Sequence, residues 1–133
     1  MNSVSPVIHI VAAVVLDDRN HVLVVRKRGT TAFMQPGGKF EAGETPLDAL
    51  RREVREELGA GITNVEALGH HDAAAANEPG HRVSADLFAV QLDGPPRLGA
   101  EIVEMAWVDP YDPGDIELAP LTLGVVLEYA RVS

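Results

Sequence analysis

The sequence predicts an α+β fold, a layered α/β/α domain built around a mixed β-sheet. Its apolar segments follow the order of strands, a helix, further strands and a second helix, without the regular alternation that a doubly wound parallel sheet requires. Of its 133 residues, 46% are apolar, which is enough for one core. No repeat, low-complexity tract or long linker divides the chain, so residues 1–133 are expected to form a single domain.

The first strands are predicted near the N-terminus, where two runs rich in Val and Ile span residues 8–17 and 21–27. They flank a polar segment at residues 18–20 that is typical of a hairpin turn, so the two runs are expected to pair with each other. A loop over residues 30–38 follows, and it ends in a Pro-Gly-Gly run.

The next element carries helix signals at both ends. Thr45 suits the N-cap, Pro46 suits the first helical position, and Asp48 lies in the first turn, where its charge favours the helix dipole. Gly59 supplies a C-terminal stop. Between these ends, apolar residues recur every three or four positions and form the one stripe of an amphipathic helix: Leu47, Leu50, Val54 and Leu58.

The remaining elements are predicted from apolar runs of strand length and from one helical spacing. Residues 62–68, 83–92 and 104–108 are expected to form strands. An Ala-rich connection at 73–80 separates the first two. The apolar spacing over residues 121–129 predicts a C-terminal helix.

Composition excludes several functional classes. A net charge of −9 argues against a nucleic-acid polymer as partner, because that affinity comes from clustered Lys and Arg, whereas a small anionic ligand remains compatible if a metal screens it. The most apolar stretch, residues 6–16, is too short to span a bilayer and lacks a basic flank, so no membrane partner is expected. The absence of cysteine fits a cytoplasmic location.

Three glutamates on the predicted central helix point to metal chemistry. Glu56 and Glu57 lie three and four residues after Glu53, so the three side chains share one face and repel one another. A hard cation such as Mg²⁺ would offset this repulsion, since it prefers carboxylate oxygens and accepts phosphate oxygens in its other positions. The alternative is a solvated acidic face, neutralised by neighbouring arginines: Arg51, Arg52 and Arg55.

The segment before this helix, residues 37–44, has three glycines around two acids and is expected to be a shaped loop rather than a strand. Gly38, five residues, Glu44, seven residues and then the run from Arg52 to Ala60 resemble the Nudix box over 23 residues. Only Ala60 departs from the pattern, since a larger aliphatic residue is usual there. The chain is therefore similar to Nudix hydrolases, and its compact length and Pro-Gly-Gly-Lys run resemble their MutT-like branch.

This resemblance implies the Nudix α/β/α sandwich and a Mg²⁺-dependent pyrophosphohydrolase, with Mn²⁺ as a substitute ion. In the family, the residues that match Glu53, Glu56 and Glu57 bind the metal, and one of them deprotonates or orients the attacking water. The match to Glu44 and Arg52 implies an ion pair that ties the loop to the helix.

The resemblance also implies further metal ligands. The residue that matches Gly38 offers its backbone carbonyl to the metal. Family members often use one more acid from a later loop, for which Glu101, six residues before Trp107, is the candidate and Glu104 the alternative.

Substrate contacts are predicted from cationic and aromatic residues near the box. Lys39 and the basic end of the second strand are candidates for binding phosphates, and alternation places Arg26 and Arg28 together on one face, opposite Lys27. Solvated surface charges are the alternative reading. Phe33 could stack on a base or pack in the core. The five histidines are left out of the site.

The expected reaction is hydrolysis of a phosphoanhydride bond in a nucleoside diphosphate derivative. The first candidate substrate is a nucleoside triphosphate, unmodified or oxidised, cleaved to the monophosphate and pyrophosphate. The purine-recognising asparagine of the MutT-like branch has no counterpart at residues 119–122. ADP-ribose, nucleotide sugars and dinucleoside polyphosphates stay open, as does a non-catalytic nucleotide-sensing module. Strand edges would permit a homodimer.

Overall fold

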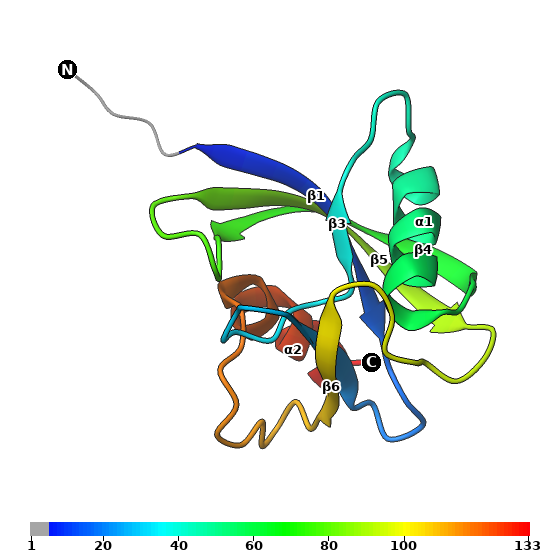
Figure 1. Ribbon diagram of the computed structural model, residues 1–133. Coiled ribbons are helices and arrows are strands. Elements are labelled where there is room, and N and C mark those ends of the chain that lie inside the picture. The colour runs from blue at the N-terminus through cyan, green and yellow to red at the C-terminus, as the bar shows by residue number, and fades with distance from the viewer. Residues whose placement is uncertain (1–5) are drawn as a thin grey trace.

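A computed structural model describes residues 6–133 and shows a mixed α and β architecture (Figure 1). The predicted α+β class is confirmed. The elements in chain order are β1 (Val7–Val15), β2 (Val22–Lys27), β3 (Gly37–Lys39), α1 (Pro46–Leu58), β4 (Ile62–Ala74), β5 (Arg82–Leu92), β6 (Ile102–Val108), a π-helical turn η1 (Thr122–Val126) and α2 (Leu127–Arg131).

The strands form two sheets. The larger has the order β3-β1-β5-β4, in which β1 runs parallel to β5 and antiparallel to β3, so the sheet is mixed as predicted. The smaller sheet is the antiparallel pair of β2 and β6. The predicted pairing of the first two strands is therefore wrong, since only an isolated bridge between Leu16 and Val22 joins them. The turn itself is correct, because the carboxylate of Asp17 accepts hydrogen bonds from two backbone N–H groups within it.

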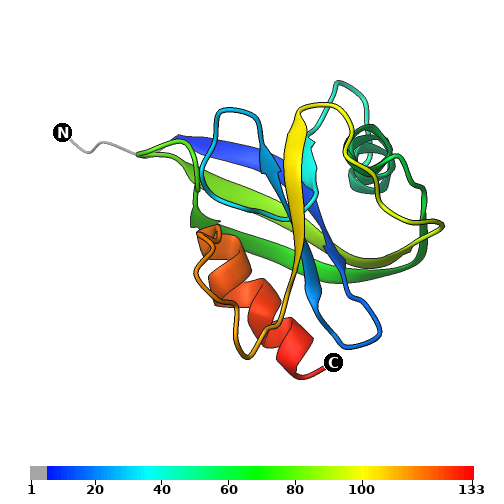
Figure 2. The ribbon, with the colours of Figure 1, turned by 60° about the horizontal axis from the view of Figure 1, so that its bottom comes forward.

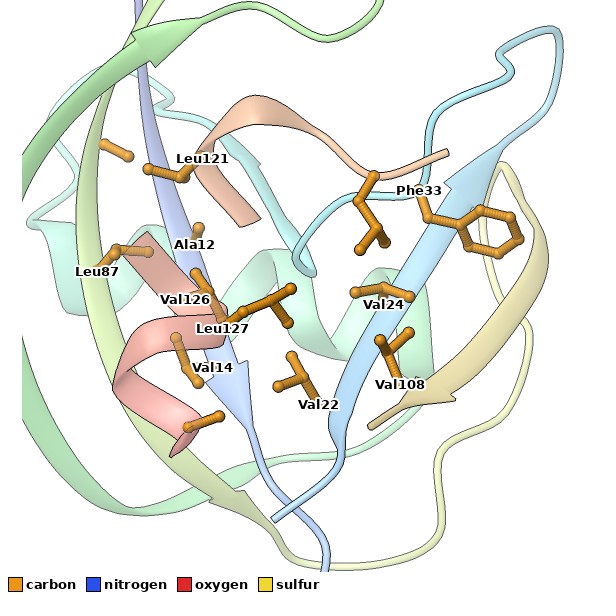
Figure 3. Packing of buried hydrophobic residues seen from close by; sticks show 13 residues of the cluster. Ala12, Val14, Val22, Val24, Phe33, Leu87, Val108, Leu121, Val126 and Leu127 are labelled. Carbon is orange, nitrogen blue, oxygen red and sulfur yellow. The ribbon is translucent and has the colours of Figure 1, made fainter. Parts of the chain in front are cut away.

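The strands form the middle layer of a sandwich between the two helices. Figure 2 shows α1 and α2 on opposite sides of the strands. Alternate residues of β1 face the two sides: Val11, Ala13 and Val15 pack with α1, whereas Ala12 and Val14 pack with α2. Figure 3 shows the buried side chains of the α2 side. The second half of β1 is buried on both faces, which accounts for its continuous apolar run.

Helix α1 begins and ends as predicted. The Thr45 side chain accepts a hydrogen bond from the Asp48 N–H, and Gly59 adopts a left-handed conformation with φ of 66°. The apolar stripe is buried, with Leu50, Val54 and Leu58 all at 0% exposure. This burial fixes the rotation of the helix, so its acidic face must turn towards β3 and the end of β2.

Several boundaries differ from the predictions. β4 continues to Ala74, because it pairs with β5 as far as Arg82. Residues 37–39, predicted to be part of a loop, form the short strand β3 against β1. The C-terminal helix opens with the π-helical turn η1. Among residues 6–133, none of the helices is long and apolar enough to cross a membrane.

Two adjacent histidines on β4 make different contacts. The Nδ1 of His70 lies 2.8 Å from the Oδ1 of Asp86, its cross-strand neighbour, and its Nε2 shares a hydrogen bond with Ser84. The Nε2 of His71 instead contacts the backbone oxygen of Leu68. The pKa of His70 is raised above its ordinary value of 6.5, chiefly because Asp86 hydrogen-bonds to the ring.

The pair of His70 and Asp86 predicts a pH-dependent stability. A raised folded pKa means that the stabilisation is fully present below the unfolded pKa of about 6.5 and is lost as pH rises through the folded pKa. The difference in unfolding free energy between wild type and His70→Gln should therefore shrink with rising pH. Denaturant titrations at several pH values measure it, and a difference that stays constant or grows would contradict this account.

Candidate active site

The acidic face of α1 packs directly on the two glycines of β3. The Gly37 N–H donates to the Oε1 of Glu57 over 2.9 Å. Gly38 lies so close to the Glu53 carboxylate that a Cβ there would overlap it. Gly37 has a φ of +150°, and a Cβ on it would collide with the backbone of Val11 on β1. Glycine is thus required at position 37 for β3 to lie against β1, and a Cβ at position 38 would displace the Glu53 carboxylate.

Glu57 is the most deeply placed of the three acids. It is only 3% exposed, and the Nζ of Lys27 lies 3.6 Å from its Oε2. Burial raises the pKa of Glu57 to about 7, against the opposing effects of the Gly37 hydrogen bond and Lys27, while the charge of Glu53 raises it further. Its partners Lys27 and Gly37 line a cavity, and a carboxyl with such a shifted pKa next to a cleft is a common mark of a functional site.

Arg52 binds the carboxylates of Glu44 and Glu53. Its guanidinium donates to both oxygens of Glu44 over 2.7 and 2.9 Å, to the Oε1 of Glu53 over 2.6 Å and to the backbone oxygen of Lys39 over 3.0 Å. The hydrogen bond from Arg52 is the main reason that the pKa of Glu44 falls to about 2, and the pKa of Arg52 is raised in turn by Glu44. The ion pair implied by the Nudix resemblance is therefore present, and it ties the loop after β3 to α1.

The donor set suits a hard divalent cation. Glu53 and Glu57 approach β3, the side chain of Glu56 is 52% exposed, and all three leave the same face of α1. Within residues 6–133, no three His, Asp or Glu side chains converge tightly enough to form a ready cage. The contacts explain this, because Arg52 holds Glu53 and Gly37 holds Glu57. Carboxylate oxygens beside a glycine backbone are nonetheless the kind of ligands that Mg²⁺ prefers.

A cavity of about 490 Å³ opens beside these residues. One end of its lining is polar and includes Lys27, Gly38, Lys39 and the box residues Arg52 and Glu53. The other end is largely apolar, with side chains from β1, the end of β4, the β4–β5 loop, the start of β5 and the residue before η1: Ile8, Ile10, Ala74, Ala75, Ala76, Val83 and Leu121. A volume of this size and mixed lining is typical of small-molecule sites.

The cations of the cavity differ in part from those predicted. Lys39 lines it as expected, but Arg26 and Arg28 do not. Arg26 donates to Glu104 over 2.6 and 2.8 Å and to the Thr30 carbonyl, and Arg28 is exposed. Lys27 takes their place, because it shares the strand face of the residues that pack against α1.

The two acids predicted as further metal ligands, Glu101 and Glu104, make different contacts. Glu104, the alternative candidate, is held by Arg26. Glu101 is exposed, and its carbonyl accepts a hydrogen bond from Arg28. The preceding segment is joined to α1, since the Gly99 N–H donates to the Glu57 carbonyl over 2.9 Å. Glu101 thus lies beside the last turn of α1, and its role as a metal ligand stays a prediction.

Phe33 packs in the core and does not line the cavity. It is 8% exposed and is labelled among the buried residues in Figure 3. The backbone explains its position, because Phe33 pairs with residues 117 and 119 and so holds its ring on the α2 side. Sequence reasoning missed several polar residues of the cavity lining, for which no periodicity or motif gave a signal: Thr30, Gln35, Asn77, Glu78 and Thr122.

Comparison with known proteins identifies the class. The family model of the NUDIX domain matches residues 8–125, and the chain therefore belongs to the Nudix family. A MutT Nudix hydrolase structure from Burkholderia pseudomallei superposes with a TM-score of 0.78 at 23% identity, covering 92% of this chain and 96% of that one. The Nudix α/β/α fold predicted from the box is thereby confirmed.

Two curated relatives match parts of the chain. An 8-oxo-dGTP diphosphatase of Proteus vulgaris is 36% identical over 87 residues, which are 62% of this chain and 75% of that protein. An RNA pyrophosphohydrolase of Halorhodospira halophila is 48% identical over 59 residues, which are 44% of this chain. The match spans only 33% of this second relative.

Proposed function

We propose that the protein is a Mg²⁺-dependent pyrophosphohydrolase of a nucleoside diphosphate derivative, with Mn²⁺ as a substitute ion. The first candidate substrate is a nucleoside triphosphate, unmodified or oxidised, cleaved to the monophosphate and pyrophosphate. The observation that carries the proposal is the packing of Glu53 and Glu57 onto the two glycines of β3 at the polar end of the cavity.

Each residue of the site has a defined task in this proposal. Glu53, Glu56, Glu57 and the Gly38 carbonyl would hold the ion, with Glu101 as a further candidate ligand. When bound, the ion neutralises phosphoanhydride oxygens and acidifies a water molecule. One of the helix carboxylates accepts the proton of the attacking water.

The remaining charged residues act on the substrate and on the loop. Lys27 and Lys39 line the cavity and offset the charge of the phosphates. Arg52 and Glu44 hold the loop after β3 against α1, which keeps the glycines and the acids in register.

Relatives support a small nucleotide as the substrate class. The Proteus vulgaris relative is named for 8-oxo-dGTP, and the net charge of −9 disfavours a nucleic-acid polymer. The relative from Halorhodospira halophila is named an RNA pyrophosphohydrolase, which supports RNA as a second candidate substrate. ADP-ribose, nucleotide sugars and dinucleoside polyphosphates share the same bond and require a direct comparison.

A substrate panel tests the proposal. Purified protein is incubated with nucleoside triphosphates, 8-oxo-dGTP, ADP-ribose, a nucleotide sugar, dinucleoside polyphosphates and a short 5′-triphosphorylated RNA, with and without Mg²⁺, and the products are separated by chromatography. We expect Mg²⁺-dependent release of pyrophosphate and a monophosphate from a nucleoside triphosphate. Binding without turnover of any compound, in Mg²⁺ or Mn²⁺, would instead indicate a nucleotide-sensing module.

A further inference from the structure

The loop between β4 and β5, residues 75–81, forms part of the wall at the apolar end of the cavity. Ala75, Ala76 and Asn77 belong to this lining. Within residues 6–133, a single hydrogen bond joins the loop to a part of the chain outside its own hairpin, since the Ala32 N–H donates to the Asn77 Oδ1 over 3.3 Å. The position of the loop therefore depends on one polar contact with the segment that precedes β3.

The segment on the other side of this contact is firmly held. The Phe33 N–H donates to the Glu117 carbonyl and the Met34 N–H donates to the Val25 carbonyl, each over 2.8 Å. Ala32 itself is only 2% exposed. A movement that breaks the contact is therefore expected to be a movement of the β4–β5 loop.

The closed position of the loop carries a free-energy cost at Asn77. Its Nδ2 is buried without an acceptor, and no other buried side-chain nitrogen or oxygen within residues 6–133 lacks a partner. An outward movement would return this donor to water and remove the cost. Little apolar packing opposes the movement, because the apolar side chains that the loop adds to the cavity wall are those of Ala75 and Ala76. Gly80, with a φ of 80° and open space around it, gives the end of the loop room to turn.

We propose that residues 75–81 are a gate over the apolar end of the cavity, which the hydrogen bond between Ala32 and Asn77 holds shut. In the closed position the loop completes the cavity wall, and in the open position it lets a ligand enter or leave. Loop movements of this kind set the rate of ligand exchange in many enzymes. The inference rests on the proposed function only for the nature of the ligand, a nucleotide.

Hydrogen exchange followed by NMR tests the opening without any ligand. Because Asn77 supplies the acceptor for the Ala32 amide, this amide should exchange about 100-fold faster than those of Phe33 and Met34. Asn77→Ala should speed exchange at Ala32 by about another 10-fold and leave the other two amides unchanged. Thr63→Ala, at an exposed position near the start of β4, is the control and should change none of the three. Equal protection of the three amides, or an Asn77→Ala effect that is absent or common to all three, would overturn the gate.

Binding kinetics test whether the ligand passes through this opening. Association and dissociation of GMP in Mg²⁺ are measured by surface plasmon resonance for wild type, Asn77→Ala and Thr63→Ala. Since both entry and exit require opening, Asn77→Ala should raise both rate constants by about 10-fold. A change in the dissociation rate alone, or in neither rate, would mean that the loop does not gate the cavity. If neither GMP nor GTP binds, the proposed function fails, and hydrogen exchange alone decides whether the loop opens as inferred.

Discussion

Replacing Glu57 or Glu53 by glutamine is expected to lower kcat by about 100-fold or more, while the fold is retained. Either change removes a carboxylate from the face that would hold the metal. At Glu57 the fold tolerates the change, because a glutamine oxygen can still accept the Gly37 hydrogen bond and the buried negative charge disappears. Initial rates of pyrophosphate release measure the effect, and circular dichroism with thermal unfolding checks the fold.

A matched control makes the loss specific. Glu128→Gln removes an exposed glutamate from α2, on the opposite side of the strands, and should leave kcat unchanged. Equal activity of the Glu53, Glu57 and Glu128 variants would refute the assignment of the acidic face to catalysis.

Gly37→Ala is expected to destabilise the protein by about 3 kcal/mol or more, since a side chain at this φ is strained and its Cβ would meet the backbone of Val11. The backbone of β1 cannot yield as a flexible side chain can. The new methyl group would force β3 away from β1 and break the hydrogen bond to Glu57. Equilibrium denaturation measures the loss, which should appear with or without Mg²⁺.

Gly38→Ala provides the comparison for this prediction. Its Cβ would meet the carboxylate of Glu53, the mobile end of a side chain, rather than the backbone. We therefore expect a small loss of stability but a clear loss of activity, because Glu53 must move. Similar stability of Gly37→Ala and wild type would show that β3 is not wedged between β1 and α1 as described.

The central helix and its acids could be predicted because their signals are local. The cap at Thr45, the stop at Gly59 and the apolar stripe depend only on neighbouring residues, and they were enough to place three glutamates on one face. Strand pairing was not predictable in the same way. β1 and β2 read as a hairpin, but β1 pairs with β3 and β5, and β2 pairs with β6.

The errors within the site also arise because contacts between distant parts of the chain decide where a side chain lies. Alternation correctly separated Lys27 from Arg26 and Arg28, but only the packing of β2 shows that the face of Lys27 meets α1. Phe33 and Asn77 lie in loops, where their direction depends on backbone bonds to residues 117 and 119 and to Ala32. A single domain over residues 1–133, a homodimer and the ligand role of Glu101 stay predictions.

The most direct test of the central claim is the rate of pyrophosphate release from GTP, measured in Mg²⁺ and again after chelation with EDTA. The account predicts steady release in Mg²⁺, none after chelation, recovery when Mg²⁺ or Mn²⁺ is restored, and little activity in Glu57→Gln under any condition. Release that persists without a divalent ion, or that Glu57→Gln retains in full, would contradict it.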